Sequence, residues 1–266
     1  MREGMQSVIM GSSPFARAVA RLPGQNFDRG ITSSNLGKPD HRLMLTQHGE
    51  YVRVLRELGV EVILLDPLPD HPDAYFVEDT AVVAPEFAVI ANPGAEARKG
   101  EEEPIAQVLA GFRSMRVRIR PPGTLDGGDV LQAGSHFFIG LSGRTNPQGV
   151  EQLGGVLTHH GYTWTTVAVE AGLHLKSSVS CIGKDTLLVA DALSDHEAFH
   201  DYPKIVLDPD DAYAANSLWI NGTLIVPKGF PGAKKKLKSA GFNPVELDVS
   251  EARKMDGGLS CMSIRF

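Results

Sequence analysis

The sequence has few of the residues that cross-link small secreted domains or build metal centres. Its 266 residues include two cysteines, Cys181 and Cys261, and two tryptophans. The two cysteines are far apart and form no C-x-x-C pair, so we expect free thiols, with neither a disulfide framework nor a bound metal. The apolar run at residues 8–10 is too short for a signal peptide, which favours the cytoplasm.

An excess of basic residues is also missing. The chain has 26 Lys and Arg against 32 Asp and Glu, a net charge of −6. Nucleic acids and anionic membranes are bound by basic surfaces, so we expect neither as a partner. No apolar stretch reaches the length of a transmembrane helix. The glycine-rich motifs that bind dinucleotides and nucleoside triphosphates are absent as well, and no cofactor is expected.

What the sequence does contain is a polar motif that recurs five times. The motifs centre on Asp79, Asp126, His174, Asn216 and Cys261. The steps between them are 47, 48, 42 and 45 residues, a period typical of solenoids, propellers and arrays. A strand-like apolar run follows each motif, and in the first four units a turn and a second such run come next.

Amphipathic helix patterns complete most of these units, at residues 101–112, 147–160 and 232–240, and a third strand closes most of them. A helix at 47–58 and a strand at 61–65 form an N-terminal unit. Five ββαβ-like units predict an α/β fold, a five-fold pseudo-symmetric propeller in one domain of residues 1–266. Radial repetition would hide the sheet edges and bring the polar motifs together near the axis. The alternative is an ordinary α/β fold in which the motifs are only turns.

Cys261 lies in the last motif, after the glycines at 257–258 and before an alternating strand pattern. Glycine permits close approach to a ligand, but free cysteine is also common in cores, so this segment alone leaves a catalytic and a structural role equally open. His174 stands between two leucines, where a buried core histidine is usual. It occupies the same place in its unit as Cys261 does, which favours a nucleophile and an acid/base. Cys181, in a strand-like run, is expected in the core.

Together these motifs resemble the dimethylarginine dimethylaminohydrolases, guanidino-group-modifying enzymes with the α/β-propeller (pentein) fold. The resemblance covers essentially the whole chain, through residues 32–39, 76–79, 144–146, 173–176 and the Cys261 segment. It implies a dimethylargininase that hydrolyses asymmetric dimethylarginine and monomethylarginine to citrulline and dimethylamine or methylamine. The reaction would pass through a covalent thiouronium on cysteine. The alternatives are a related hydrolase or amidinotransferase acting on another guanidino compound, such as arginine, and a non-catalytic amino-acid-binding propeller.

The resemblance also implies a set of site residues. Cys261 would be the nucleophile, His174 the acid and base, and Asp126 the partner of His174. Other members resemble this chain but carry Glu in place of Asp126, and an aspartate before Gly-Gly can also be a plain turn residue. The family's substrate-contacting positions match Ile31, Asp73, Glu78, Asp79, Arg98, Arg144 and Met255.

The charges of these residues suit the two ends of an arginine-like amino acid. We expect Asp79 to bind the guanidinium and Asp73 the α-ammonium. Glu78 would have a supporting role, because neighbours at a strand end point to opposite sides. Arg98 and Arg144 would bind the carboxylate, since arginine pairs with it in a bidentate manner.

Residues 31–38, rich in small polar side chains between Gly30 and Gly37, are expected to form a mobile lid rather than an ordinary surface turn. The expected partner is a small methylated arginine. A homodimer is compatible with the sequence.

Overall fold

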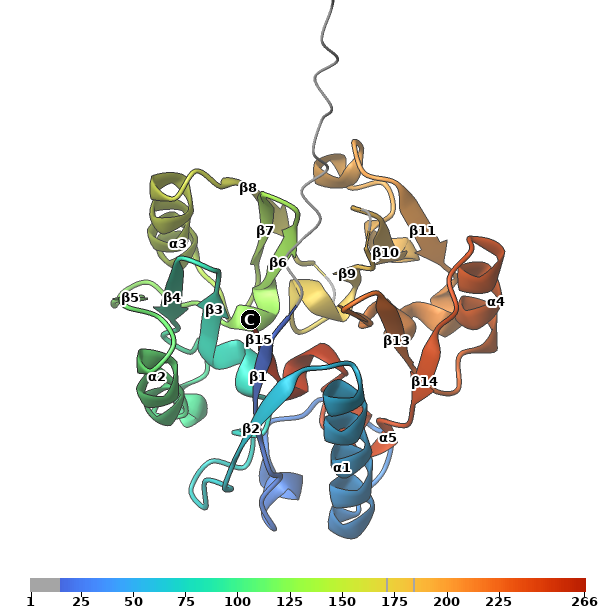
Figure 1. Ribbon diagram of the computed structural model, residues 1–266, viewed down its shortest axis with the longest axis horizontal. Helices are drawn as coiled ribbons and strands as arrows, with labels where there is room; N and C mark the ends of the chain where they lie inside the picture. Colours follow the sequence, from blue (N-terminus) through green and yellow to red (C-terminus); the bar gives the residue numbers. More distant parts are fainter. Residues whose placement is uncertain (1–14, 171, 184) are drawn as a thin grey trace, which may run out of the picture.

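The computed structural model describes residues 15–170, 172–183 and 185–266. Within these residues the strands form five three-stranded sheets, which surround a central axis like the blades of a propeller (Figure 1). In every sheet the middle strand pairs antiparallel with one neighbour and parallel with the other. The predicted five-fold α/β propeller is therefore confirmed.

Four of the sheets consist of consecutive strands. They are β3 (Ala81–Val83), β4 (Phe87–Ile90) and β5 (Met115–Arg118); β6 (Val130–Ala133), β7 (His136–Leu141) and β8 (Thr163–Ala168); β9 (Val179–Cys181), β10 (Leu187–Ala190) and β11 (Lys204–Leu207); and β12 (Leu218–Ile220), β13 (Thr223–Pro227) and β14 (Val245–Leu247). Each antiparallel pair is a short hairpin. The third strand of each sheet runs parallel to the second, so it needs a longer crossover connection.

The fifth sheet joins the two ends of the described chain. Its strands are β15 (Ile264–Arg265), β1 (Arg17–Arg21) and β2 (Glu61–Leu65). Val19 of β1 pairs with Ile264 of β15 in antiparallel register. The strand expected after Cys261 thus closes the ring, whereas β1 was not predicted, because its five residues follow no recognisable polar motif.

Helices make the crossover in four of the five blades and lie at the outer rim (Figure 1). They are α1 (His41–Glu57), α2 (Glu102–Ala110), α3 (Pro147–His159) and α4 (Pro231–Ser239). α1 begins six residues earlier than expected, because the Asp40 side chain caps it by accepting from the Leu43 N–H. In the β9–β11 blade two 3-10 turns, Asp191–Leu193 and Glu197–Phe199, take the place of the helix.

Each polar motif of the repeat lies on or directly beside a 3-10 turn that leads into the first strand of a blade. These turns are Val77–Thr80, Gly127–Asp129, Leu175–Ser177, Pro209–Ala215 and Ser260–Met262. This corrects one expectation, since the Glu78–Asp79 pair lies within a 3-10 turn and not at the end of a strand. A tight turn brings the chain to the axis before it enters the blade, so the side chains of several blades meet there.

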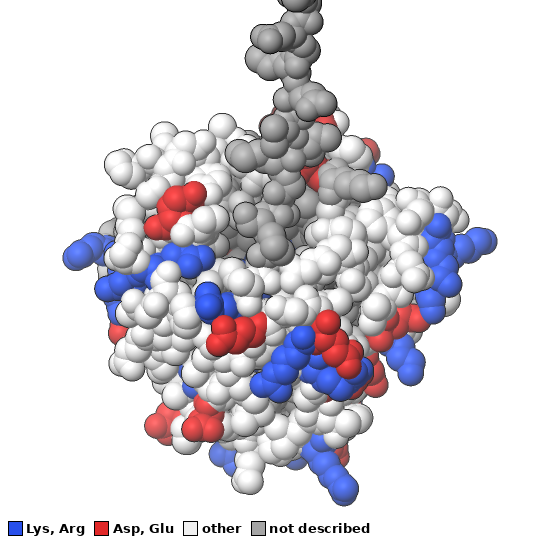
Figure 2. Space-filling view, in the orientation of Figure 1, with Lys and Arg blue, Asp and Glu red and all other residues white. Residues whose placement is uncertain are grey.

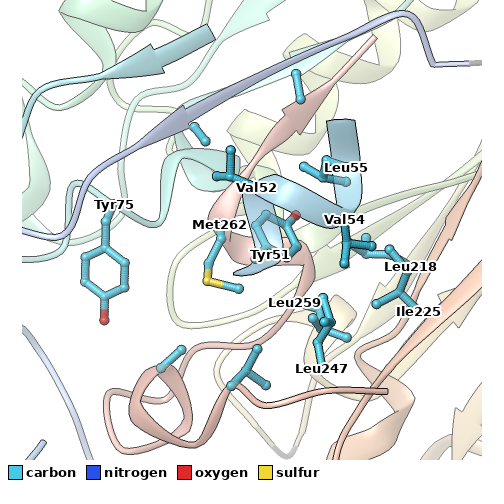
Figure 3. Packing of buried hydrophobic residues seen from close by; sticks show 14 of the residues in the cluster. Tyr51, Val52, Val54, Leu55, Tyr75, Leu218, Ile225, Leu247, Leu259 and Met262 are labelled. Carbon is cyan, nitrogen blue, oxygen red and sulfur yellow. The ribbon is translucent and has the colours of Figure 1, made fainter. Parts of the chain in front are cut away.

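The packing around the Cys261 turn is firm. Leu259 and Met262 flank Cys261 and are 0% and 1% exposed. Both belong to an apolar cluster with Tyr51 of α1 and Leu218 of β12 (Figure 3). Because protein interiors are close-packed, a segment held at both flanks has little freedom to shift. A short helix, α5 (Ser250–Arg253), precedes this turn and was not predicted.

The charged side chains on one face of the propeller are scattered, with Lys and Arg lying among Asp and Glu around the rim (Figure 2). None of the helices in the described residues combines the length and the apolar character that crossing a membrane requires.

Candidate active site

A pocket near the axis brings together nine of the ten residues expected to form the site. They are Ile31, Asp73, Glu78, Asp79, Arg98, Arg144, His174, Met255 and Cys261. The tenth, Asp126, is 0% exposed and lies behind His174 instead of lining the pocket. Residues from all five repeated motifs therefore converge here with the segments around Ile31 and Met255.

His174 is held at the pocket wall by Asp126. Its Nε2 lies 3.0 Å from Asp126 Oδ2, while the other carboxylate oxygen of Asp126 accepts from the Gly94 N–H at 3.0 Å. The remaining ring nitrogen, Nδ1, lies 3.9 Å from Asp79 Oδ1. Burial alone would lower the pKa of His174, but the surrounding carboxylates, Asp79 first among them, raise it to about 9. The imidazole is therefore a cation at neutral pH and can donate a proton from Nδ1.

Gly128 is the residue that permits the close approach of Asp79 and His174. A Cβ at this position would lie 2.6 Å from Asp79 Oδ1 and 2.8 Å from the His174 ring. The Gly128 N–H also donates to Asp79 Oδ1 at 3.0 Å. Side-chain packing at the axis therefore requires a glycine at position 128.

Cys261 is partly exposed and lines the pocket. Burial of its thiol, followed by the negative charges of Glu78 and Asp79, raises the pKa to about 12. In the free protein the sulfur is thus protonated. A thiolate forms readily only when a positive charge offsets these two carboxylates.

Glu78 turns away from Asp79, into a buried ionic cluster. Its Oε1 accepts from Lys176 Nζ and from Arg265 Nη2, both at 2.7 Å, and its Oε2 accepts from Ser260 Oγ at 2.6 Å. Burial would raise the pKa of Glu78, but Lys176 and Arg265 bring it below the usual value. Glu78 thus accepts three hydrogen bonds within the protein, whereas Asp79 accepts two, one on each oxygen. Asp79 is therefore the acid of this pair with more acceptor capacity left for a ligand.

Arg98 holds Asp79 in place. Its Nη1 donates to Asp79 Oδ2 at 2.5 Å, and its Nε and Nη2 donate to Glu101 Oε2 at 3.0 and 2.7 Å. Burial opposes its charge, but Asp79 and Glu101 raise the pKa of Arg98 well above its usual value. Most of its donors are thus directed at buried acids, an arrangement that the sequence did not predict.

Arg144 differs from Arg98 in that a buried part of its guanidinium is unpartnered. Its Nη1 has no hydrogen-bond partner among the described residues, although the atom is shielded from solvent. The Arg144 backbone meets Gly94 so closely that a Cβ on Gly94 would lie 2.2 Å from the Arg144 carbonyl oxygen. A cation fixed at its backbone with a free donor suits a carboxylate.

The expected lid is attached to the pocket at two points. The Ile31 N–H donates to Asp73 Oδ2 at 2.9 Å. The Ser33 N–H and Oγ both donate to Asp256 Oδ2, at 2.5 and 2.9 Å. Burial raises the pKa of Asp73. Ile31 itself is 41% exposed, so the segment covers the pocket edge without being buried in it.

Three site groups also have a spacing that suits a metal ion. One ligand atom each from Asp79, Asp126 and His174 lies within 4.8 Å of the others. The His174–Asp126 hydrogen bond and the Arg98–Asp79 ion pair already use these groups. A cation bound there would compete with both contacts, so hydrogen bonding accounts for the cluster.

The sequence did not identify several residues that shape the pocket. Lys176, Asn216, Ser260 and Asp256 all line it. Lys176, Asn216 and Ser260 stood within the repeated motifs, so their position in the repeat was a usable signal. Asp256 had no such signal, because its contact with Ser33 joins segments more than 200 residues apart.

Comparison with known proteins identifies relatives over most of the chain. Residues 34–200 match the family model described as N,N dimethylarginine dimethylhydrolase, eukaryotic. The N(G),N(G)-dimethylarginine dimethylaminohydrolase of Pseudomonas aeruginosa is 40% identical over 95% of this chain and 100% of that protein. The protein of the same name in Streptomyces coelicolor is 34% identical over 95% of this chain and 98% of its own.

A solved structure matches closely as well. The Pseudomonas aeruginosa protein, crystallised as a cysteine-to-serine mutant complexed with citrulline, aligns with a TM-score of 0.93 and 39% sequence identity. The alignment covers 96% of this chain and 100% of that one.

Proposed function

Because this chain belongs to the dimethylarginine dimethylaminohydrolase family of hydrolases, we propose that it hydrolyses Nω-methylated L-arginine to L-citrulline and methylamine or dimethylamine. The observation that carries the proposal is the arrangement of Cys261, His174 and Asp79 around one pocket. A nucleophile, a protonated imidazole and a carboxylate that can bind a cation are the groups this reaction needs.

The pocket offers partners for both ends of the substrate. Asp79 binds the guanidinium, in an orientation fixed by Arg98 and Gly128. At the other end Asp73 and the backbone near Ile31 and Met255 take the α-ammonium. Arg144 binds the carboxylate with the Nη1 donor that lacks a partner. Arg98 adds positive charge at the carboxylate end of the substrate, but its main role is to hold Asp79 in place.

The first half-reaction begins with ionisation of the thiol. Because Glu78 and Asp79 oppose a negative sulfur, the cationic guanidinium itself promotes thiolate formation when it binds, and the thiol proton is released to solvent. The thiolate attacks the guanidinium carbon, and a tetrahedral intermediate forms. His174 then donates the Nδ1 proton to the methylated nitrogen, the C–N bond breaks, and the amine leaves a thiouronium on Cys261.

The second half-reaction uses the neutral imidazole that remains. His174 takes a proton from a water molecule, which attacks the thiouronium carbon. The C–S bond then breaks, the proton on the added hydroxyl passes to the departing sulfur, and citrulline is released, so that Cys261 is again a thiol and His174 again a cation. Asp126 keeps the imidazole oriented and stabilises its charged form in both halves.

The test is replacement of the proposed nucleophile. Cys261→Ser should release no citrulline, while still binding the substrate through Asp79 and Arg144. Mass spectrometry of acid-quenched wild-type enzyme should detect a substrate adduct on the C-terminal peptide. Cys181→Ser is the matched control and should retain full turnover. An adduct on Cys181, or citrulline release by Cys261→Ser, contradicts the proposal.

A related reaction on another guanidino compound, such as arginine, would use the same groups. A panel of arginine, monomethylarginine, and asymmetric and symmetric dimethylarginine, assayed for citrulline, separates the two. The proposal requires the methylated substrates to have the higher kcat/KM. We further propose that residues 1–266 act as one domain in the cytoplasm, where both cysteines stay free thiols, and that a homodimer is compatible with this activity.

A further inference from the structure

One of the five repeated motifs has no part in the proposed chemistry. Asn216 belongs to the fourth unit, 42 residues after His174 and 45 before Cys261. Its side chain is 5% exposed and lines the same pocket. Buried polar side chains need hydrogen-bond partners, so the partners of Asn216 indicate what it does.

The Asn216 amide joins the turns that carry His174 and Cys261. Its Nδ2 donates to the Lys176 carbonyl at 2.8 Å and to Ser260 Oγ at 2.9 Å. Its Oδ1 accepts from the Ser260 N–H at 3.0 Å. Lys176 is two residues beyond His174, and Ser260 directly precedes Cys261. One planar group therefore contacts the backbone on the His174 side and on the Cys261 side.

The surrounding packing is built around this amide. A Cβ on Gly258 would lie 2.4 Å from Asn216 Oδ1, so the glycine before the Cys261 turn leaves room for it. The Asn216 N–H donates to the Tyr213 carbonyl, which fixes its backbone in the fourth blade. Ser260 Oγ, in turn, donates to Glu78. Asn216 is thus anchored beside the β12–β14 blade, and its side chain connects the turn that carries His174 with the turn that carries Cys261.

We propose that Asn216 is a positioning residue that sets the placement of the Cys261 sulfur relative to the His174 imidazole. The inference rests on the proposed function, in which these two groups act on one substrate carbon. This positioning role requires both polar atoms of the Asn216 amide. The acceptor Oδ1 fixes the Cys261 turn, and the donor Nδ2 fixes the His174 turn. Loss of such alignment slows the chemical steps by about tenfold to a hundredfold. It leaves substrate affinity largely intact, since Arg144 and Asp73 lie on other segments.

The experiment compares two variants of similar size. Asn216→Leu removes all three hydrogen bonds. Asn216→Asp keeps the acceptor for the Ser260 N–H and loses the donor to the Lys176 carbonyl and to Ser260 Oγ. With asymmetric dimethylarginine, both should lower kcat about tenfold to a hundredfold and change KM by less than about threefold. Asn221→Asp, in the turn of the same blade, is the matched control and should leave both constants unchanged.

Amide hydrogen exchange provides a readout that needs no turnover. The Ser260 N–H should exchange faster in Asn216→Leu and stay protected in Asn216→Asp. Wild-type kcat in Asn216→Asp would overturn the bridging role, as would a rise in KM that accounts for the lost kcat/KM. Unchanged exchange at Ser260 in Asn216→Leu would also overturn it. If the wild-type enzyme released no citrulline, the proposed function would fail, and the exchange result would still decide whether Asn216 fixes the turn.

Discussion

The ionic cluster around Glu78 should be a major determinant of stability, and Glu78→Gln tests this directly. The side chain of Glu78 is 4% exposed, and those of Lys176 and Arg265 are 14% and 13% exposed. Gln fills the same space but leaves two cations without a countercharge. Removing one partner of a buried ion pair costs about 3–5 kcal/mol. The slight exposure of both cations places our expectation at the lower end, about 3 kcal/mol.

Urea unfolding at neutral pH measures this cost, and Glu96→Gln is the control. Glu96 pairs with Lys99 on the surface, where the side chains are 86% and 45% exposed, so its loss should cost less than about 0.5 kcal/mol. The pKa of Glu78 lies below its usual value of 4.5 in the folded protein. Its charge therefore stabilises the fold above pH 4.5, and the contribution is lost as the pH falls through the folded pKa. The reasoning would be refuted if both variants lost the same small free energy of unfolding. It would also be refuted if the difference between the wild type and Glu78→Gln persisted in strong acid.

Three further predictions follow from the pocket geometry. Gly128→Ala should lower kcat about tenfold to a hundredfold by displacing His174. Gly155→Ala is the control and should keep wild-type kinetics, because a Cβ there meets nothing within 4 Å. Equal kcat values for the two variants would contradict the packing argument. Because the pKa of His174 is raised, its charge stabilises the fold below pH 6.5, and this contribution is lost as the pH rises through about 9. The difference in unfolding free energy between the wild type and His174→Gln should therefore shrink between these pH values. A difference that stays constant over this range would contradict the prediction. Asp256→Asn should speed amide hydrogen exchange in residues 31–38, and a bound, slowly turned-over substrate should slow it again. If neither the substitution nor the substrate changed the exchange rates, the segment would be a plain loop.

Much of the fold could be predicted because it repeats. A period of 42 to 48 residues predicts blades, and the alternation of short apolar runs and amphipathic helices predicts their contents. The helices α2, α3 and α4 lie within two residues of the expected ranges. The exceptions are local. The β9–β11 blade has 3-10 turns where other blades have a helix. β1 gave no signal because no recognisable polar motif precedes it.

The candidate site was predicted to a similar extent, through residue type and position in the repeat. Nine expected residues line one pocket. Their pairing was harder to predict, because charge complementarity alone allowed Arg98 to bind a ligand carboxylate. In the structure, burial makes Asp79 and Glu101 its closest partners, since a buried charge must find a countercharge.

By itself, then, the sequence determined the number of blades and the types of polar residue that meet at the axis. These features depend on local pattern and residue type, which are properties of the chain at each position. The tertiary structure decided that Glu78 pairs with Lys176 and Arg265, that burial raises the pKa of the Cys261 thiol, and that Asn216 joins two turns. Those properties depend on burial and on distances between residues far apart in the chain, and both arise only when the blades close around the axis.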